Sequence, residues 1–112
     1  MNIFNGFAEL EISGKVLGFR FGWNSNAIFC ELTGTKLSEL SGKLSNPSPG
    51  DLRDFYFSAY RANCLSKEID QELNRWQFGD LMDEMRPEDF NKLVSAITGS
   101  LPTGEDGESK KN

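Results

Sequence analysis

The sequence of 112 residues contains no histidine and only two cysteines, Cys30 and Cys64, which lie far apart. Histidine is the most common general base near neutral pH and the most common metal ligand, so its absence argues against catalysis and metal binding. Two separated thiols cannot complete a structural zinc site. Both cysteines lie among apolar residues, which predicts reduced thiols in the core. We therefore expect no enzymatic activity, no cofactor and no bound metal.

Basic stretches and long apolar runs are also missing. The chain has 12 Lys and Arg residues against 17 Asp and Glu residues, a net charge of −5. Such a chain repels phosphate backbones, so nucleic acid is an unfavourable partner. No segment approaches the ~20 apolar residues of a membrane-spanning helix, and a signal peptide is not recognisable at the N-terminus. These features predict a cytoplasmic protein that contacts neither nucleic acid nor membrane.

Strand periodicity is present near the start of the chain. Residues 7–12 and 16–21 place alternate side chains on two faces, which predicts two strands. The segment between them is a turn signal in which Gly14 can adopt a positive φ. Because a two-stranded hairpin alone is barely stable, it must pack on helices or pair with a second copy through its exposed edge.

Helical periodicity follows the hairpin. Asn24 or Ser25 is the expected N-cap of a first helix, and Gly34 is its expected end. The run Ser-Pro-Gly-Asp at 48–51 combines an N-cap, a proline at the first helical position and a capping box, so it predicts the longest and most buried helix. Pro87 predicts the start of a last helix. The expected fold is α+β: an N-terminal two-stranded antiparallel hairpin followed by a bundle of four to five helices.

The domain organisation is read from length and composition. Residues 1–102 have the length of one α+β domain. Residues 103–112 contain no large apolar side chain and are rich in charged and polar residues. This composition predicts a flexible acidic and polar tail.

Aromatic residues are the remaining candidates for recognition, since the chain has nine Phe, two Trp and two Tyr residues. Exposed aromatic side chains often anchor interfaces. We select Tyr60, Trp76 and Phe78 as partner-binding candidates. Polar neighbours surround Trp76, which leaves both a surface and a core position open for it. Trp23 lies at the turn from strand to helix, and we expect it to fill the core.

Residues 19–34 carry a family resemblance. They read FRFGWNSNAIFCELTG, a strand that ends in Phe-Gly followed by a short helix that ends in Glu-Leu-Thr-Gly. A leucine-rich segment, a proline-led helix start and a Phe-Gly-Asp-Leu-Met run follow in order. Over roughly residues 8–98 the chain resembles the tail assembly chaperones of long-tailed bacteriophages and prophages. The resemblance implies structural roles for the residues Phe21, Gly22, Glu31, Thr33 and Gly34.

The resemblance also implies a function. Such chaperones bind the tape-measure protein, a long, helical and apolar-rich chain, and keep it soluble while tail tube subunits polymerise around it. They act in the cytoplasm of the bacterial host and are not retained in the mature virion. The expected partners are therefore the tape-measure protein and the tail tube subunits. Two other classes stay open: a small phage structural adaptor of the head–tail or tail-completion kind, and a protein-interaction module unrelated to phage.

Overall fold

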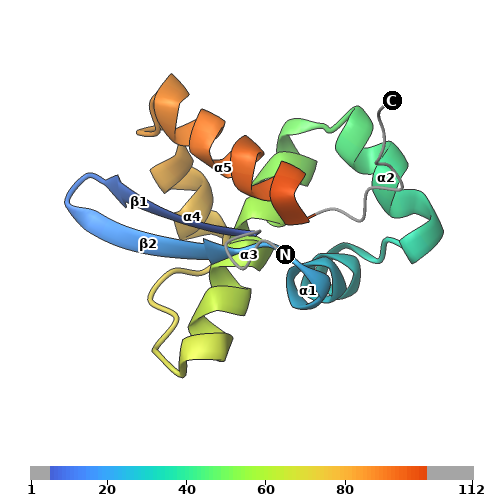
Figure 1. The fold of residues 1–112 in the computed structure, drawn as a ribbon, viewed down its shortest axis with the longest axis horizontal. Coiled ribbons are helices and arrows are strands. Elements are labelled where there is room, and N and C mark those ends of the chain that lie inside the picture. Colours follow the sequence, from blue (N-terminus) through green and yellow to red (C-terminus); the bar gives the residue numbers. More distant parts are fainter. Residues whose placement is uncertain (1–5, 101–112) are drawn as a thin grey trace.

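The computed structural model describes residues 6–100, and the side chains of residues 6–97. The expected α+β fold is confirmed, with a hairpin first and five helices after it (Figure 1). The predicted tail at residues 103–112 lies outside the described residues. In chain order the elements are β1 (Phe7–Ile12), β2 (Lys15–Arg20), α1 (Trp23–Thr33), α2 (Leu37–Ser45), α3 (Pro49–Lys67), α4 (Arg75–Met82) and α5 (Pro87–Ser100).

The hairpin pairs residues 7–12 with residues 15–20 in antiparallel register. Ser13 and Gly14 both have positive φ, 52° and 83°, as a two-residue type I′ turn requires. One face of the hairpin is exposed and carries acidic side chains, while the other face packs on the helices. The buried face consists of Ala8, Leu10, Ile12, Leu17 and Phe19.

Helix α3 is the centre of the molecule. Its start is capped as predicted: the Ser48 hydroxyl accepts a hydrogen bond from the Asp51 amide (3.1 Å), and the Asp51 carboxylate accepts one from the Ser48 amide (3.0 Å). It is the longest helix described, with 19 residues, and ten of them are buried. It packs against α1, β2, α4 and α2, so Figure 1 shows it running between the other elements.

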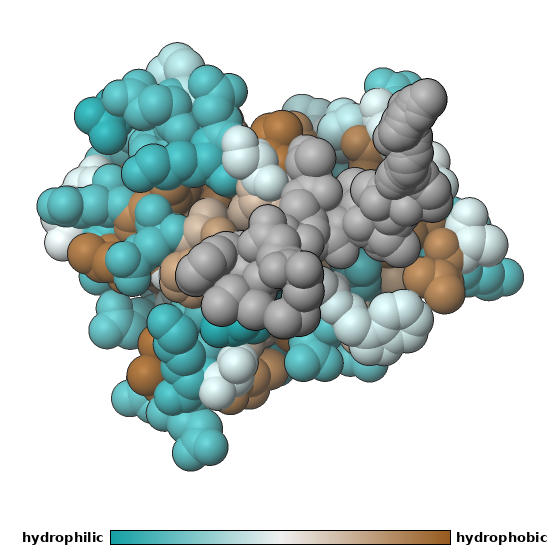
Figure 2. All heavy atoms as spheres, viewed as in Figure 1, coloured by the Kyte–Doolittle hydropathy of each residue, from teal (hydrophilic) through white to brown (hydrophobic). Residues whose placement is uncertain are grey.

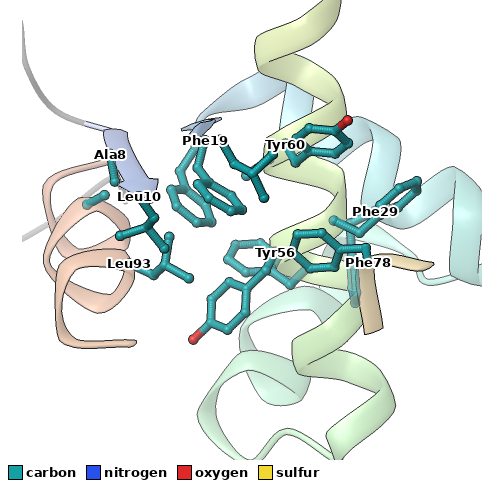
Figure 3. Packing of buried hydrophobic residues seen from close by; sticks show 14 of the residues in the cluster. Ala8, Leu10, Phe19, Phe29, Tyr56, Tyr60, Phe78 and Leu93 are labelled. Carbon is teal, nitrogen blue, oxygen red and sulfur yellow. The ribbon is translucent and has the colours of Figure 1, made fainter. Parts of the chain in front are cut away.

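The core between the hairpin and α3 is largely aromatic. The Phe19 ring of β2 meets the Phe78 ring of α4 edge-on, with 6.0 Å between centroids. Tyr60 of α3 stacks on Phe78 with 6.0 Å between centroids, and its ring centroid also lies 6.5 Å from that of Phe19 (Figure 3). Burying one such ring contributes roughly 1.5–3 kcal/mol relative to leaving it exposed. The aromatic residues that seemed available for recognition are therefore largely used to hold the fold together.

The start of α1 differs from the prediction. The N-cap is Gly22, not Asn24 or Ser25. Ser25 lies at the third helical position, where its buried hydroxyl accepts a hydrogen bond from the Gly22 amide (2.8 Å) and donates one to the Gly22 carbonyl (2.9 Å). Because Ser25 satisfies the helix end from inside the first turn, the helix can begin directly after the glycine. The predicted end of α1 is confirmed, with Gly34 at φ 74° in the left-handed region.

Candidate partner-binding surface

Two of the three predicted partner-binding residues lie in the core. Phe78 is fully buried and Tyr60 is 4% exposed. The Tyr60 hydroxyl accepts hydrogen bonds from the amides of Glu72 (3.0 Å) and Leu73 (3.2 Å), which fixes the connection between α3 and α4. A partner cannot reach either ring in this fold. The selection of Tyr60 and Phe78 was therefore wrong, because the core needs their rings.

The third predicted residue, Trp76, is on the surface, 65% exposed. The guanidinium carbons of Arg53 and Arg75 lie 4.7 Å and 5.5 Å from its ring centroid, within cation–π distance. Both arginines bind the carboxylate of Asp54, Arg53 at 2.8 Å and Arg75 at 2.6 Å. We call these four residues the Trp76 clamp. A role of Trp76 in partner binding stays a prediction.

The carboxylate at the base of the Trp76 clamp is charged at neutral pH. Asp54 is only 4% exposed, and burial acts to raise its pKa. Hydrogen bonds from Arg75 and Arg53, together with their charges, outweigh burial and hold the pKa of Asp54 below its usual value. The clamp is therefore a charged structural unit that joins α3 to α4.

A hollow of about 350 Å³ lies beside the clamp and has mixed character. It is lined by Trp76 and Met82, but also by Arg53, Asp80 and Asp83. Neither aspartate has an ion-pair partner within residues 6–97. The lining of this hollow is therefore partly apolar and partly charged.

Trp23 was expected in the core, but it is 75% exposed. The buried positions of α1 are Ser25 and Phe29, one turn apart. Trp23 lies two residues before Ser25, about 200° around the helix, so it must point away from the core. The outward face of α1 has its own stripe at the spacing i, i+3, i+4, i+7, formed by Trp23, Asn26, Ala27 and Cys30.

An apolar hollow of about 160 Å³ lies on this outward face of α1. The stripe from Trp23 to Cys30 lines it on one side, and Leu37 of α2, 63% exposed, lines it on the other. No charged residue belongs to the lining. The Trp23 side chain has no hydrogen bond, ion pair or ring contact with the described part of the chain. We call this site the Trp23 hollow.

A second hollow of about 400 Å³ runs along the other side of α1, between α1 and α3. We call it the α1–α3 groove. Leu65, 61% exposed, forms part of its α3 side, and Ala27 belongs to both hollows. The two hollows therefore adjoin across α1. The full lining of the groove is Asn24, Ala27, Ile28, Glu31, Ala62, Leu65 and Ser66.

Four of the five residues of the family resemblance occupy structural positions. Phe21 is buried in the core, Gly22 caps α1, and Gly34 ends it. The Thr33 hydroxyl donates a hydrogen bond to the carbonyl one turn earlier (2.7 Å). Glu31 is different, because it is exposed and lies at the edge of the α1–α3 groove. The expected structural role does not extend to Glu31.

Other chemistry is scarce in the described part of the chain. Both cysteines are free, Cys64 in the core and Cys30 only half-buried in the Trp23 hollow. Burial raises the pKa of the Cys64 thiol, which keeps it protonated at neutral pH. Within residues 6–100 no three His, Cys, Asp or Glu side chains are grouped to hold a metal ion. None of the helices there has the length and apolar character needed to cross a membrane.

The residues missed from the sequence are Trp23, Cys30, Leu37 and Leu65. A signal for the first two was present, because α1 carries apolar side chains on both faces, with Phe29 on one and Trp23 and Cys30 on the other. A short helix with two apolar faces has one face more than the core can use. Figure 2 shows one side of the molecule, where brown hydrophobic residues interrupt a mostly hydrophilic surface in several separate places.

Compared with protein-family models, curated proteins and solved structures, the chain matches none. The function proposed below therefore depends on the resemblance seen in the sequence and on the geometry of these surfaces.

Proposed function

We propose that the protein is a tail assembly chaperone that binds and solubilises the tape-measure protein of a long-tailed phage or prophage. It acts without enzymatic activity or a cofactor, in the cytoplasm of the bacterial host, and leaves before the virion is complete. The observation that supports this proposal most directly is the Trp23 hollow, an apolar site whose exposed tryptophan side chain has no hydrogen bond, ion pair or ring contact within the described residues.

The chemistry of the Trp23 hollow suits an apolar, helical partner. Because no charged residue lines the hollow, covering it desolvates no charge. An aliphatic side chain of the partner can enter between Trp23 and Leu37, and both side chains then lose contact with water. Exposed tryptophans that become buried in this way are frequent hot spots of interfaces. The net charge of −5 helps to keep the complex in solution.

Two further contacts belong to the proposal. Tail tube subunits are the proposed next partner, because they polymerise around the tape-measure protein. A second copy of the chain is proposed to pair with the hairpin edge, where strand backbone groups are available for pairing. Light scattering at increasing protein concentration tests this pairing, and a monomer at all concentrations contradicts it.

Capture of the tape-measure protein tests the main proposal. The chain, carrying an affinity tag, is co-expressed with the candidate tape-measure protein, and the captured amount is measured. We expect Trp23→Ala to reduce capture at least ~10-fold, since a hot-spot aromatic contributes about 2 kcal/mol. Trp76→Ala is the comparison variant, because it removes an equally large and similarly exposed side chain from a charged surface, and it also tests the predicted role of Trp76 in partner binding.

The outcomes separate the alternatives. If the unmodified chain captures no tape-measure protein, the chaperone proposal is wrong. If both tryptophan variants lose capture equally while circular dichroism shows an intact fold, the Trp23 hollow is not the binding site. Mass spectrometry of purified virions gives the remaining decision: a chaperone is absent from the particle, whereas a head–tail or tail-completion adaptor is present in it.

A further inference from the structure

The α1–α3 groove has the form of a site for a third helix. It lies between two helices that pack closely on each other, and its residues come from one face of each. Three of these residues, Ala27, Ala62 and Ser66, are small, so an entering helix can approach the backbone closely. Ile28 and Leu65 supply larger apolar side chains for it to contact. A helix fits this shape better than an extended peptide, which would need a free strand edge.

The charge of the groove lies at one end. Glu31 is the only charged residue in the lining. It is exposed, and it has no ion pair or hydrogen bond to a side chain within residues 6–97. It lies in the last turn of α1, where the helix dipole is negative, and this turn contains no basic residue. The carboxylate and the helix end therefore both attract a cation at this end of the groove.

The length of the groove limits what it can hold. Asn24 at one end and Glu31 at the other are seven residues apart on α1, which corresponds to about 10 Å, or two helical turns. An occupant of this length presents an apolar stripe of two turns with one charged residue at its end.

We propose that the α1–α3 groove binds an amphipathic helix whose apolar stripe ends in a lysine or arginine, and that this basic side chain pairs with Glu31. The inference rests on the proposed function in one respect, since the tape-measure protein would supply the helix. It adds to that function a requirement that the partner segment be basic as well as apolar.

Binding of designed peptides tests the groove itself. The probe is a fluorescent 18-residue helical peptide with a Leu/Ala stripe that ends in Lys, and its twin carries Glu in place of that Lys. We expect the Lys peptide to bind the purified full chain at least ~5-fold more tightly than the twin, as about 1 kcal/mol of charge pairing gives. A third peptide with a central proline cannot form the helix, and we expect it not to bind.

Variants of the chain identify the site. We expect Glu31→Gln to remove the preference for the Lys peptide, while Leu65→Asp weakens both peptides by placing a charge in the apolar part of the groove. Both residues are exposed, so circular dichroism should show an unchanged fold. Glu84→Gln is the matched control, because it removes the same charge from another exposed residue that has no ion pair in the described chain.

Several results would overturn the inference. Among them are equal affinity for the Lys and Glu peptides, equal loss in Glu31→Gln and Glu84→Gln, and binding of the proline peptide. Self-association of the chain that Leu65→Asp abolishes would mean that a second copy occupies the groove. The two proposals can fail separately. Peptide binding without capture of the tape-measure protein contradicts only the chaperone proposal. Capture that is unchanged in Glu31→Gln and Leu65→Asp contradicts only the proposal for the α1–α3 groove.

Discussion

The two tryptophans of this protein are similarly exposed, 75% for Trp23 and 65% for Trp76, but their surroundings differ. Trp76 lies against two arginines that share a buried carboxylate. Trp23 lines an apolar hollow, and its side chain has no ring contact, ion pair or hydrogen bond with the described residues. Exposure alone therefore does not identify a binding residue. An aromatic ring that its own chain already holds with cations is part of the fold, whereas an unheld ring is available to a partner.

The largest loss of stability is expected when an arginine of the Trp76 clamp is removed. Arg75→Ala leaves the buried Asp54 carboxylate with Arg53 as its only cation in the clamp. Removing one partner of a buried ion pair costs about 3–5 kcal/mol, and we expect the lower end here because Arg75 is partly exposed. Urea unfolding measures the loss. Arg61→Ala, an exposed arginine of the same size on α3, should change the free energy of unfolding by less than ~0.5 kcal/mol.

The same carboxylate predicts a pH dependence. Because the pKa of Asp54 is lower in the folded chain than its ordinary value, the unfolded chain takes up the proton first as the pH falls. The stabilisation is therefore present above about pH 4, the unfolded-state pKa, and is lost as the pH falls through the folded-state pKa. Thermal unfolding between neutral and strongly acidic pH should show this loss. The Asp54→Asn variant, which is already destabilised at neutral pH, should lose less stability on acidification than the unmodified chain. An equal loss of stability in both would contradict the role of Asp54.

A smaller effect is expected from the clamped ring itself. Trp76→Ala removes two cation–π contacts, each contributing about 0.5–1 kcal/mol at an exposed site. We therefore expect the free energy of unfolding to fall by about 1 kcal/mol. Trp76→Phe keeps an aromatic face and should recover part of this loss. If Trp76→Ala leaves the stability unchanged, the arginines do not hold the ring, and the clamp is only an ion-pair network.

Local signals made much of this fold predictable. The capping box of Ser48 and Asp51 lies within one turn, and the hairpin turn at Gly14 within two residues, so each was visible in the sequence. The position of Tyr60 depended on distant residues, because its hydroxyl binds amides twelve and thirteen positions later. A position of this kind is set by tertiary packing, which the sequence pattern does not encode locally.

The candidate site was hidden for a related reason. Helix α1 has apolar residues on both faces, and periodicity cannot choose which face becomes the core. The face that becomes the core is the one with Phe29, whose ring centroid lies 5.7 Å from that of Phe55 of α3. This contact turns Trp23 outward and leaves Leu37 beside it at the start of α2. The proposed binding surface is thus the face of α1 that does not pack into the core, and its identification required the position of α3.

The smallest change in stability is expected for Trp23→Ala, and this variant tests the difference between the two tryptophans most directly. Trp23→Ala removes a side chain that contacts little of the described chain, so the free energy of unfolding should change by no more than ~0.5 kcal/mol. The same substitution should cause the larger loss in partner capture, the reverse of the order expected for Trp76→Ala. Urea unfolding of the two variants side by side measures the first quantity. A loss above about 1 kcal/mol for Trp23→Ala would mean that this ring also supports the fold, and the distinction between a held and an available tryptophan would no longer apply.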